Sequence, residues 1–237
     1  MLASWDIAIV CPERLQRQVR SLVAPPVQVR ACPDRYFGSV KNYNRLMLSR
    51  AFYGAFEDYE YMLIVQLDAL VISDQLAAWC QKGHSYVGAP WFRGYARPKR
   101  PLEFAGVGNG GFSLRRIPDF VHVLRRVRWL GPLPGGYVEK SALGWVLDAV
   151  IFGFNRPPFS PRVNEDLFWG ALVPARVSQF RVPAPHEAIR FAFEAEPRHL
   201  YALTDGELPF GCHAWEKHDR SFWIERLTSI DGSSALK

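Results

Sequence analysis

A run of residues from Tyr61 to Leu67, apolar except for Gln66, ends at an acidic residue, Asp68. Continuous apolar runs of this length are typical of strands that are covered on both faces. In open α/β sheets, ligands bind at the carboxyl ends of the strands, which is where Asp68 would lie. An acid at this place can also simply cap the next loop or helix. Its meaning therefore depends on other segments of the chain.

The first part of the chain alternates between segments typical of strands and segments typical of helices. Strands are predicted at Trp5–Cys11, Val27–Ala31 and Tyr61–Leu67, and helices at Glu13–Leu22, Asn44–Phe56 and Asp74–Gln81. Such alternation implies right-handed crossovers and parallel strand pairing. We therefore expect an α/β fold with a Rossmann-like, mainly parallel central sheet flanked by helices, whose nucleotide-binding half is formed by residues 1–91.

Length and composition restrict the class of protein. A chain of 237 residues fits one large α/β domain or at most two small ones, and we expect one. Apolar residues make up 49% and charged residues 22%, which fits a globular protein. The net charge of +6 rests mostly on arginine, which suits phosphate recognition but can equally reflect a compositional bias. We expect no nucleic-acid partner.

No segment approaches the roughly 20 apolar residues that span a bilayer, and no basic segment precedes the strand predicted from Trp5. We therefore expect no signal peptide. The four cysteines are far apart and form no C-x-x-C pair, which favours reduced thiols in the cytoplasm and argues against a zinc site. Basic stretches at Arg93–Arg100 and Arg115–Arg116 leave peripheral contact with the inner face of the membrane open, although no helix combines a basic face with a strong apolar face.

The regular alternation stops after Trp91. The segment Phe92–Pro101 is rich in glycine, proline and cations, and it is either a surface connection or a flap that closes over a substrate phosphate. Two later Gly/Pro-rich stretches, residues 130–137 and 155–161, flank a helix predicted at Lys140–Val150.

Three of the four residues Gly108–Gly111 are glycines, and a short strand-like segment, Phe112–Arg115, follows them. Glycines allow a backbone to approach a ligand closely because no Cβ is in the way. The spacing matches neither a P-loop nor a dinucleotide-binding fingerprint. A tight turn would explain two of the glycines, and contact with a substrate would explain all three.

Asn164, Glu165 and Asp166 form a typical helix start, in which the asparagine caps the helix and two acids occupy its first turn. A carboxylate held there is also fixed in direction, as a general base must be. His213 lies among aromatic residues near the end of the chain. It is either a core histidine bonded to a carbonyl or a metal ligand that completes a site begun by Asp68.

Taken in order, Asp68, the glycine loop, the Glu165–Asp166 pair and His213 resemble four common elements of GT-A-fold glycosyltransferases: the D-x-D motif, the G-loop, the x-E-D motif and the C-terminal histidine. More narrowly, six ordered motifs between about Cys32 and Trp223 resemble an uncharacterised bacterial family of GT-A-like proteins. These motifs are Tyr43–Met47, Gln66–Ala69, Gly88–Trp91, Gly108–Arg115, Asn164–Trp169 and Pro209–Trp215.

The resemblance implies one GT-A-like domain over residues 1–237, whose acceptor-binding and catalytic half is residues 92–237. It implies that Asp68 and His213 bind Mn²⁺ or Mg²⁺, and that Asp166, in a catalytic pair with Glu165, is the base of an inverting transfer. Gln66 replaces the first acid of D-x-D and would instead bond the ribose or the base. The residues expected to bind substrate are Arg35, Lys41, Asn44, Gln66, Asn109, Gly110, Gly111 and Trp215.

The function expected from this resemblance is transfer of a sugar from a nucleotide diphosphate sugar to a hydroxyl of a glycan or a lipid-linked acceptor. A UDP-sugar is the first candidate for the donor. The metal and nearby cations would stabilise the leaving diphosphate. Two alternatives remain. The chain could be a sugar-phosphate nucleotidyltransferase, or a non-catalytic module that binds nucleotide sugars or glycans on aromatic platforms.

Overall fold

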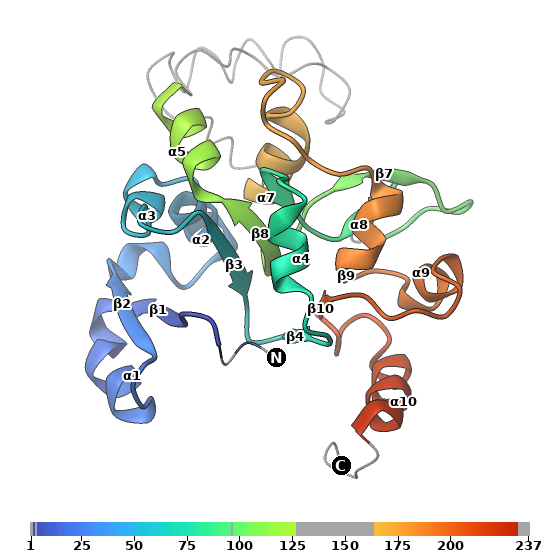
Figure 1. Cartoon of the computed structure of the whole chain (residues 1–237), viewed down its shortest axis with the longest axis horizontal. Coiled ribbons are helices and arrows are strands. Elements are labelled where there is room, and N and C mark those ends of the chain that lie inside the picture. Colours follow the sequence, from blue (N-terminus) through green and yellow to red (C-terminus); the bar gives the residue numbers. More distant parts are fainter. Residues whose placement is uncertain (1, 3, 96, 127–163, 232–237) are drawn as a thin grey trace. The chain divides into compact units, whose positions relative to one another are not determined.

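The computed structural model describes residues 2, 4–95, 97–126 and 164–231, which fold into helices and short strands (Figure 1). This confirms the α/β class. The chain divides into two compact units. Unit 1 comprises Met1–Phe56 and Val121–Glu165, and unit 2 comprises Glu57–Phe120 and Asp166–Lys237. The expected single domain over the whole chain stays a prediction.

Unit 1 contains a pair of parallel strands, β1 (Ala8–Pro12) and β2 (Gln28–Cys32). The connection between them contains η1 (Glu13–Leu15) and α1 (Gln16–Leu22). This is the strand, helix and parallel strand that the alternation predicts. The chain continues into η2 (Asp34–Tyr36), α2 (Val40–Met47) and α3 (Arg50–Gly54).

The helix predicted at Asn44–Phe56 is wrong in its bounds, because two helices occupy this part of the chain. The first, α2, begins earlier, where the Ser39 side chain accepts a hydrogen bond from the backbone N–H of Asn42 at 3.2 Å. It ends at Leu48, and the extended backbone of Ser49, with φ −87° and ψ 123°, separates it from α3.

Unit 2 contains three small sheets. In the first, β3 (Tyr61–Val65), β8 (Phe112–Arg116) and β5 (Tyr86–Val87) are bonded in that order. In the second the order is β4 (Ala69–Val71), β10 (Gly211–His213) and β9 (Ala192–Phe193). In the third, β6 (Pro90–Phe92) pairs with β7 (Phe104–Val107).

The described residues also form further helices. They are α4 (Leu76–Gln81), α5 (Ile117–Arg126), α7 (Glu165–Leu167), the π-helical turn η4 (Phe168–Leu172), α8 (Pro185–Phe191), α9 (Pro197–Leu203) and α10 (Arg220–Asp231). None of the helices in this part of the chain is long and apolar enough to cross a bilayer. The helix predicted at Lys140–Val150 lies outside the described residues.

The strand directions differ from the mainly parallel central sheet that the alternation predicts. Both β3 and β5 run antiparallel to β8, and they are therefore parallel to each other. The connection between them contains α4, as expected for a crossover, but β8 lies between the two strands. The alternation in the sequence concerns neighbouring segments only, so it cannot reveal that a later strand is inserted between them.

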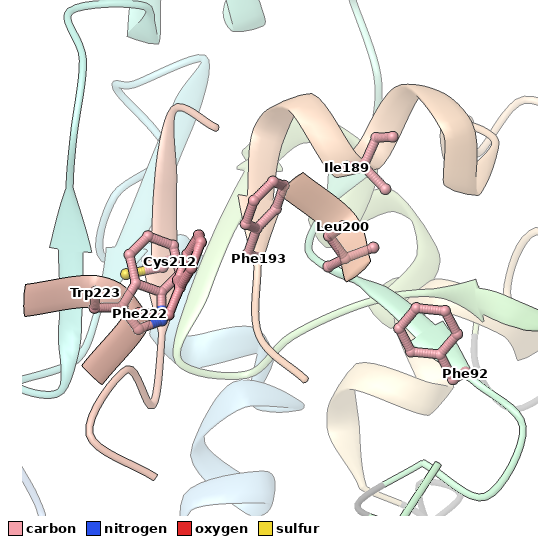
Figure 2. Packing of buried hydrophobic residues seen from close by; sticks show 7 residues of the cluster. All are labelled: Phe92, Ile189, Phe193, Leu200, Cys212, Phe222 and Trp223. Atoms are coloured by element: carbon pink, nitrogen blue, oxygen red, sulfur yellow. The ribbon is translucent and has the colours of Figure 1, made fainter. Parts of the chain in front are cut away.

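One apolar cluster of unit 2 holds the sheet that contains β10 (Figure 2). Its buried members come from β6, α8, β9, α9, β10 and α10. They are Phe92, Ile189, Phe193, Leu200, Cys212, Phe222 and Trp223. In Figure 2 the Cys212 side chain lies close to those of Phe222 and Trp223. Each fully buried large apolar side chain contributes about 1.5–3 kcal/mol to folding, so this cluster fixes the strand that leads to His213.

Replacement of Gly211 by alanine should destabilise the protein. A Cβ at this position would lie 2.2 Å from Cζ of Phe112 and 2.6 Å from the carbonyl oxygen of Leu70, so the β4–β10 pair must shift. We expect a loss of about 1–3 kcal/mol, measured as a lower midpoint of thermal unfolding. The control is Gly54→Ala in α3, where a Cβ meets no atom within 4 Å and the midpoint should stay or rise. Equal midpoints for the two variants would contradict this packing.

Candidate active site

The pairing of β10 on both sides brings two acidic residues to His213. In the antiparallel pair with β4, His213 lies opposite Ala69, the residue after Asp68. In the parallel pair with β9, the last paired residue of β9 is Phe193, and Glu194 follows it. Backbone register therefore places an imidazole between two carboxylates that come from distant parts of the chain, all within unit 2.

The imidazole of His213 is held by Glu194. Its Nδ1 lies 2.9 Å from Oε1 of Glu194, and its Nε2 lies 3.4 Å from Oδ1 of Asp68. An ionised carboxylate can only accept hydrogen bonds, so Nδ1 carries the proton that Glu194 accepts. The Nε2 atom is buried and makes no hydrogen bond within the described chain. When the ring is neutral, this arrangement leaves the lone pair on Nε2, on the side that faces Asp68.

The glycine loop reaches the same place. A Cβ on Gly111 would lie 2.0 Å from Nε2 of His213, so only glycine leaves room for this imidazole. The Gly111 carbonyl accepts a hydrogen bond from the backbone N–H of Gln66 at 2.8 Å, which joins the loop to the end of β3. The expected meeting of Asp68 and His213 is therefore present in the structure, and the glycine loop lies at the same place.

Asn109 holds the glycine loop in shape. Its Oδ1 accepts hydrogen bonds from the backbone N–H groups of Gly111 at 2.7 Å and Phe112 at 2.8 Å. Its own backbone N–H donates to the hydroxyl of Tyr86, which donates in turn to the Asn109 carbonyl. The residue is only 2% exposed. This geometry gives the Asn109 side chain a positioning role, and its contact with substrate stays a prediction.

The donor atoms suit a hard divalent cation. One carboxylate oxygen and one imidazole nitrogen fit Mn²⁺, and Mg²⁺ when phosphate oxygens and water supply the remaining positions. Within the described ranges, no group of three or more His, Cys, Asp or Glu side chains is arranged to hold a metal by itself. Asp68 and His213 could supply two ligands of such an ion, and Glu194 would orient the ligand imidazole.

Asp166 is a buried acid with a raised pKa. Burial raises the pKa of its carboxyl, and the hydrogen bond from the backbone N–H of Leu167, at 2.8 Å, lowers it in part. The charge of Glu194 also raises the pKa of Asp166, whereas Arg115 lowers it. Asp166 thus lies within electrostatic range of Glu194, the partner of His213. Directly after α7 the chain forms η4, a π-helical turn of the kind often found at functional sites.

Glu165, the expected partner of Asp166, is buried with only 1% of its surface exposed. This favours a structural role over contact with an acceptor. The cap expected from Asn164 stays a prediction, and the structure shows a contact of Asn44 with the start of this helix, α7. Oδ1 of Asn44 accepts from the backbone N–H of Glu165 at 3.3 Å, and Nδ2 of Asn44 donates to Oδ1 of Asn164 at 3.1 Å. Both polar atoms of the Asn44 side chain are therefore used inside unit 1.

The two cations expected to bind the nucleotide are exposed residues of unit 1. Lys41 lies in the first turn of α2, and Arg35 stacks its guanidinium on the ring of Tyr36, with the group 4.9 Å from the ring centroid. Both side chains are accessible to a ligand. Their contact with a nucleotide stays a prediction.

The remaining predicted substrate-binding residues lie in unit 2. Trp215 packs against the apolar cluster around β10, which favours a packing role. Gln66 forms a turn in which its carbonyl accepts from the backbone N–H of Ala69 at 3.0 Å, and its side chain is half-buried. Gly110 lies in the glycine loop next to Gly111 and is also half-buried.

Glu194 is the residue of this site that the sequence analysis missed. It directly follows the two-residue strand β9, just as Asp68 follows the β3 segment after a short turn. An acid at the carboxyl end of a buried strand was the signal that drew attention to Asp68. The same signal exists at Glu194, but the strand before it is too short to be recognised in a sequence.

The tautomer of His213 provides a direct test of this geometry. In ¹⁵N NMR spectra at a pH where the ring is neutral, we expect the proton on Nδ1, because Glu194 accepts from that atom. Glu194→Ala should allow the other tautomer and lower stability by about 1.5–3 kcal/mol. Glu207→Ala, which removes only an exposed partner of Arg190, is the control. A wild-type ring protonated on Nε2 would contradict the pairing.

Comparison with known proteins places the chain in a family. The family model described as "Protein of unknown function (DUF5672)" matches residues 26–213, which include Asp68, the glycine loop, Glu194 and His213. The searches of curated proteins and of solved structures found no match. Because the family model covers most of the chain, the protein belongs to the DUF5672 family.

Proposed function

We propose that this protein is a glycosyltransferase. It transfers a sugar from a nucleotide diphosphate sugar to a hydroxyl of a glycan or a lipid-linked acceptor, and a UDP-sugar is the first candidate for the donor. The observation that carries the proposal is the convergence of Asp68, Gly111 and His213, which come from three distant parts of the chain. Their order along the chain, with Asp166 between the glycine loop and the histidine, is also the order of the GT-A elements.

The donor atoms support a site for the leaving diphosphate. Asp68 and His213 would hold Mn²⁺ or Mg²⁺, and this ion would neutralise the charge that develops on the diphosphate when the sugar leaves. Glu194 keeps the proton of His213 on Nδ1 and so directs Nε2 toward Asp68. Gly111 leaves room for the imidazole at this place.

Asp166 would act as the base. In a direct displacement, a carboxylate must take the proton from the acceptor hydroxyl on the face of the sugar opposite the leaving diphosphate, and the anomeric configuration inverts. A base is most effective when its pKa is close to the working pH, and burial raises the pKa of Asp166 in that direction. The hydrogen bond from Leu167 fixes the direction of the carboxylate.

We also propose that the small sheets belong to a GT-A-type domain. The parallel direction of β3 and β5, with α4 in the connection between them, agrees with the Rossmann-like half of such a domain. The acid at the end of the β3 segment is where open α/β sheets bind ligands. These observations fit a GT-A arrangement, and an experimental structure with a bound nucleotide would test it.

Metal-dependent binding of UDP should require Asp68 and His213. For the wild-type protein, Mn²⁺ with UDP should raise the midpoint of thermal unfolding, because a ligand at 100 times its dissociation constant stabilises the folded state by about 2.7 kcal/mol. Asp68→Asn and His213→Ala should each remove the part of this shift that depends on Mn²⁺. The control is Asp74→Asn, an exposed acid that precedes α4. If both site variants keep the full shift, the two residues do not bind the metal.

Asp166→Asn should bind the donor normally but lose transfer activity by about 10²- to 10⁴-fold, because a positioned base is removed. In the wild-type protein, turnover should rise as the pH passes above the raised pKa of Asp166, since only the ionised carboxylate accepts a proton. This inflection should be absent in the variant. Asp205→Asn, at an exposed acid, is the matched control, because asparagine tolerates its left-handed backbone, φ 55°.

The stereochemistry of the product decides between mechanisms. NMR of the first product formed should show inversion of the anomeric carbon relative to the donor. Retention would overturn the direct displacement, and near-normal turnover by Asp166→Asn would overturn the assignment of the base. A protein that binds UDP-sugars but shows neither transfer nor slow hydrolysis of the donor would instead be a module that only binds them.

A further inference from the structure

The long connection between β6 and β7 carries a concentration of positive charge. Residues 93–103, called here the basic loop, contain four cations, Arg93, Arg97, Lys99 and Arg100, and one acid, Glu103. All four cations are exposed. Figure 1 shows this connection as a long extension beside β7. The loop is thus a positively charged projection of unit 2.

The backbone of the basic loop is held by internal hydrogen bonds. The N–H of Arg93 donates to the carbonyl of Glu103 at 2.9 Å, and the N–H of Lys99 donates to the carbonyl of Arg93 at 2.8 Å. The N–H of Arg97 donates to the carbonyl of Gly94 at 3.0 Å. Gly94 has φ +92°, and a Cβ there would lie 2.3 Å from the carbonyl oxygen of Arg97. The cations are therefore presented on a defined turn.

Two of the four cations have acidic partners, and two do not. Arg93 pairs with Glu103 at 3.0 Å, and Arg100 pairs with Glu196 at 2.8 Å. Arg97 and Lys99 form no ion pair with any residue that the structure describes. Exposed ion pairs contribute little to stability, and unpaired exposed cations contribute less. The charge of Arg97 and Lys99 therefore has no evident role in the fold and is available to a partner.

An aromatic residue lies between these cations. Tyr95 has a left-handed backbone, φ 50°, and 40% of its surface is exposed. Its ring contacts that of Trp91 edge-on, with centroids 5.7 Å apart. Trp91 is buried in β6, so the aromatic pair fastens the turn to the body of unit 2. A tyrosine with an exposed ring and a polar hydroxyl suits the boundary between water and lipid headgroups.

The other basic stretch of the sequence, Arg115–Arg116, does not form such a surface. Arg115 is completely buried, with its Nε donating to the hydroxyl of Ser113 at 3.0 Å. Arg116 pairs with Glu60 at 3.0 Å and with Asp119 at 3.2 Å. Of the two stretches considered for membrane contact, only the basic loop therefore offers unpaired charge at the surface.

We propose that the basic loop docks this protein on the surface of an anionic phospholipid membrane. The unpaired charges of Arg97 and Lys99 attract phosphate headgroups, Arg93 and Arg100 flank them, and Tyr95 inserts its ring at the headgroup level. Each cation near an anionic membrane strengthens binding by about fivefold, so the loop gives reversible, salt-sensitive attachment. A soluble anion would also bind the cations, but the partly exposed Tyr95 between them favours a surface with an apolar layer beneath its charges.

Vesicle sedimentation tests the proposal without any nucleotide sugar, so its outcome is independent of the proposed enzymatic function. The full chain should sediment with vesicles that contain phosphatidylglycerol and not with vesicles of phosphatidylcholine alone. Binding should weaken as the salt concentration rises. The double variant Arg97→Glu, Lys99→Glu should bind roughly 25-fold more weakly or worse, since two cations are lost. Because these side chains have no ion pairs, circular dichroism should show an unchanged fold.

The matched control is Arg17→Glu, Arg20→Glu on α1, which changes the net charge by the same amount at two exposed positions of unit 1. This control should keep most of the vesicle binding. Equal weakening by both double variants would overturn the proposal, because net charge would then explain the attachment. Tyr95→Ala should also weaken binding, whereas Tyr95→Phe should keep it. Binding to a soluble acidic polysaccharide but to no vesicle would make the loop a polyanion site and refute the membrane assignment.

Discussion

The double pairing of β10 is the interaction on which the candidate active site depends. Hydrogen bonds to β4 on one side and to β9 on the other fix the register of His213 against Asp68 and Glu194. A slip of one residue would turn the imidazole to the opposite face of the sheet. The apolar cluster around Cys212 and Trp223 holds the strand against such a slip. The apolar packing that stabilises β10 therefore also fixes the geometry of the site.

The electrostatic character of the site follows from this register. Two carboxylates flank one imidazole, with Asp68 on its Nε2 side and Glu194 on its Nδ1 side. Asp68 is about half exposed, with 51% of its side chain accessible, whereas Glu194 and His213 are more deeply placed. Solvent can reach the carboxylate at the open end, while the inner carboxylate orients the ring. This order from inside to outside suits a site that receives a cation from solution.

The alternation of segments predicted the α/β class and the crossover of unit 1, because both leave local patterns in the sequence. The meeting of Asp68 and His213 was expected only from the resemblance to GT-A-fold glycosyltransferases, because a contact between residues so far apart leaves no local pattern. The sequence did not predict strand directions, since the insertion of β8 between β3 and β5 is a non-local event. Residue types also did not reveal burial. Asn109 and Glu165 are chemically suited to bind ligands, yet the structure encloses both.

The contact of Asn44 with the start of α7 joins residues that are 121 positions apart. A three-residue helix cannot form by itself in water, because nucleation costs more than so few hydrogen bonds return. Formation of α7 therefore depends on its contact with α2. The entropy lost when the long chain segment between them is closed into a loop opposes this contact. We therefore expect the acid pair to become ordered late in folding. A chain that lacks the residues before α3 would also lack Asn44, and the start of α7 would lose this contact.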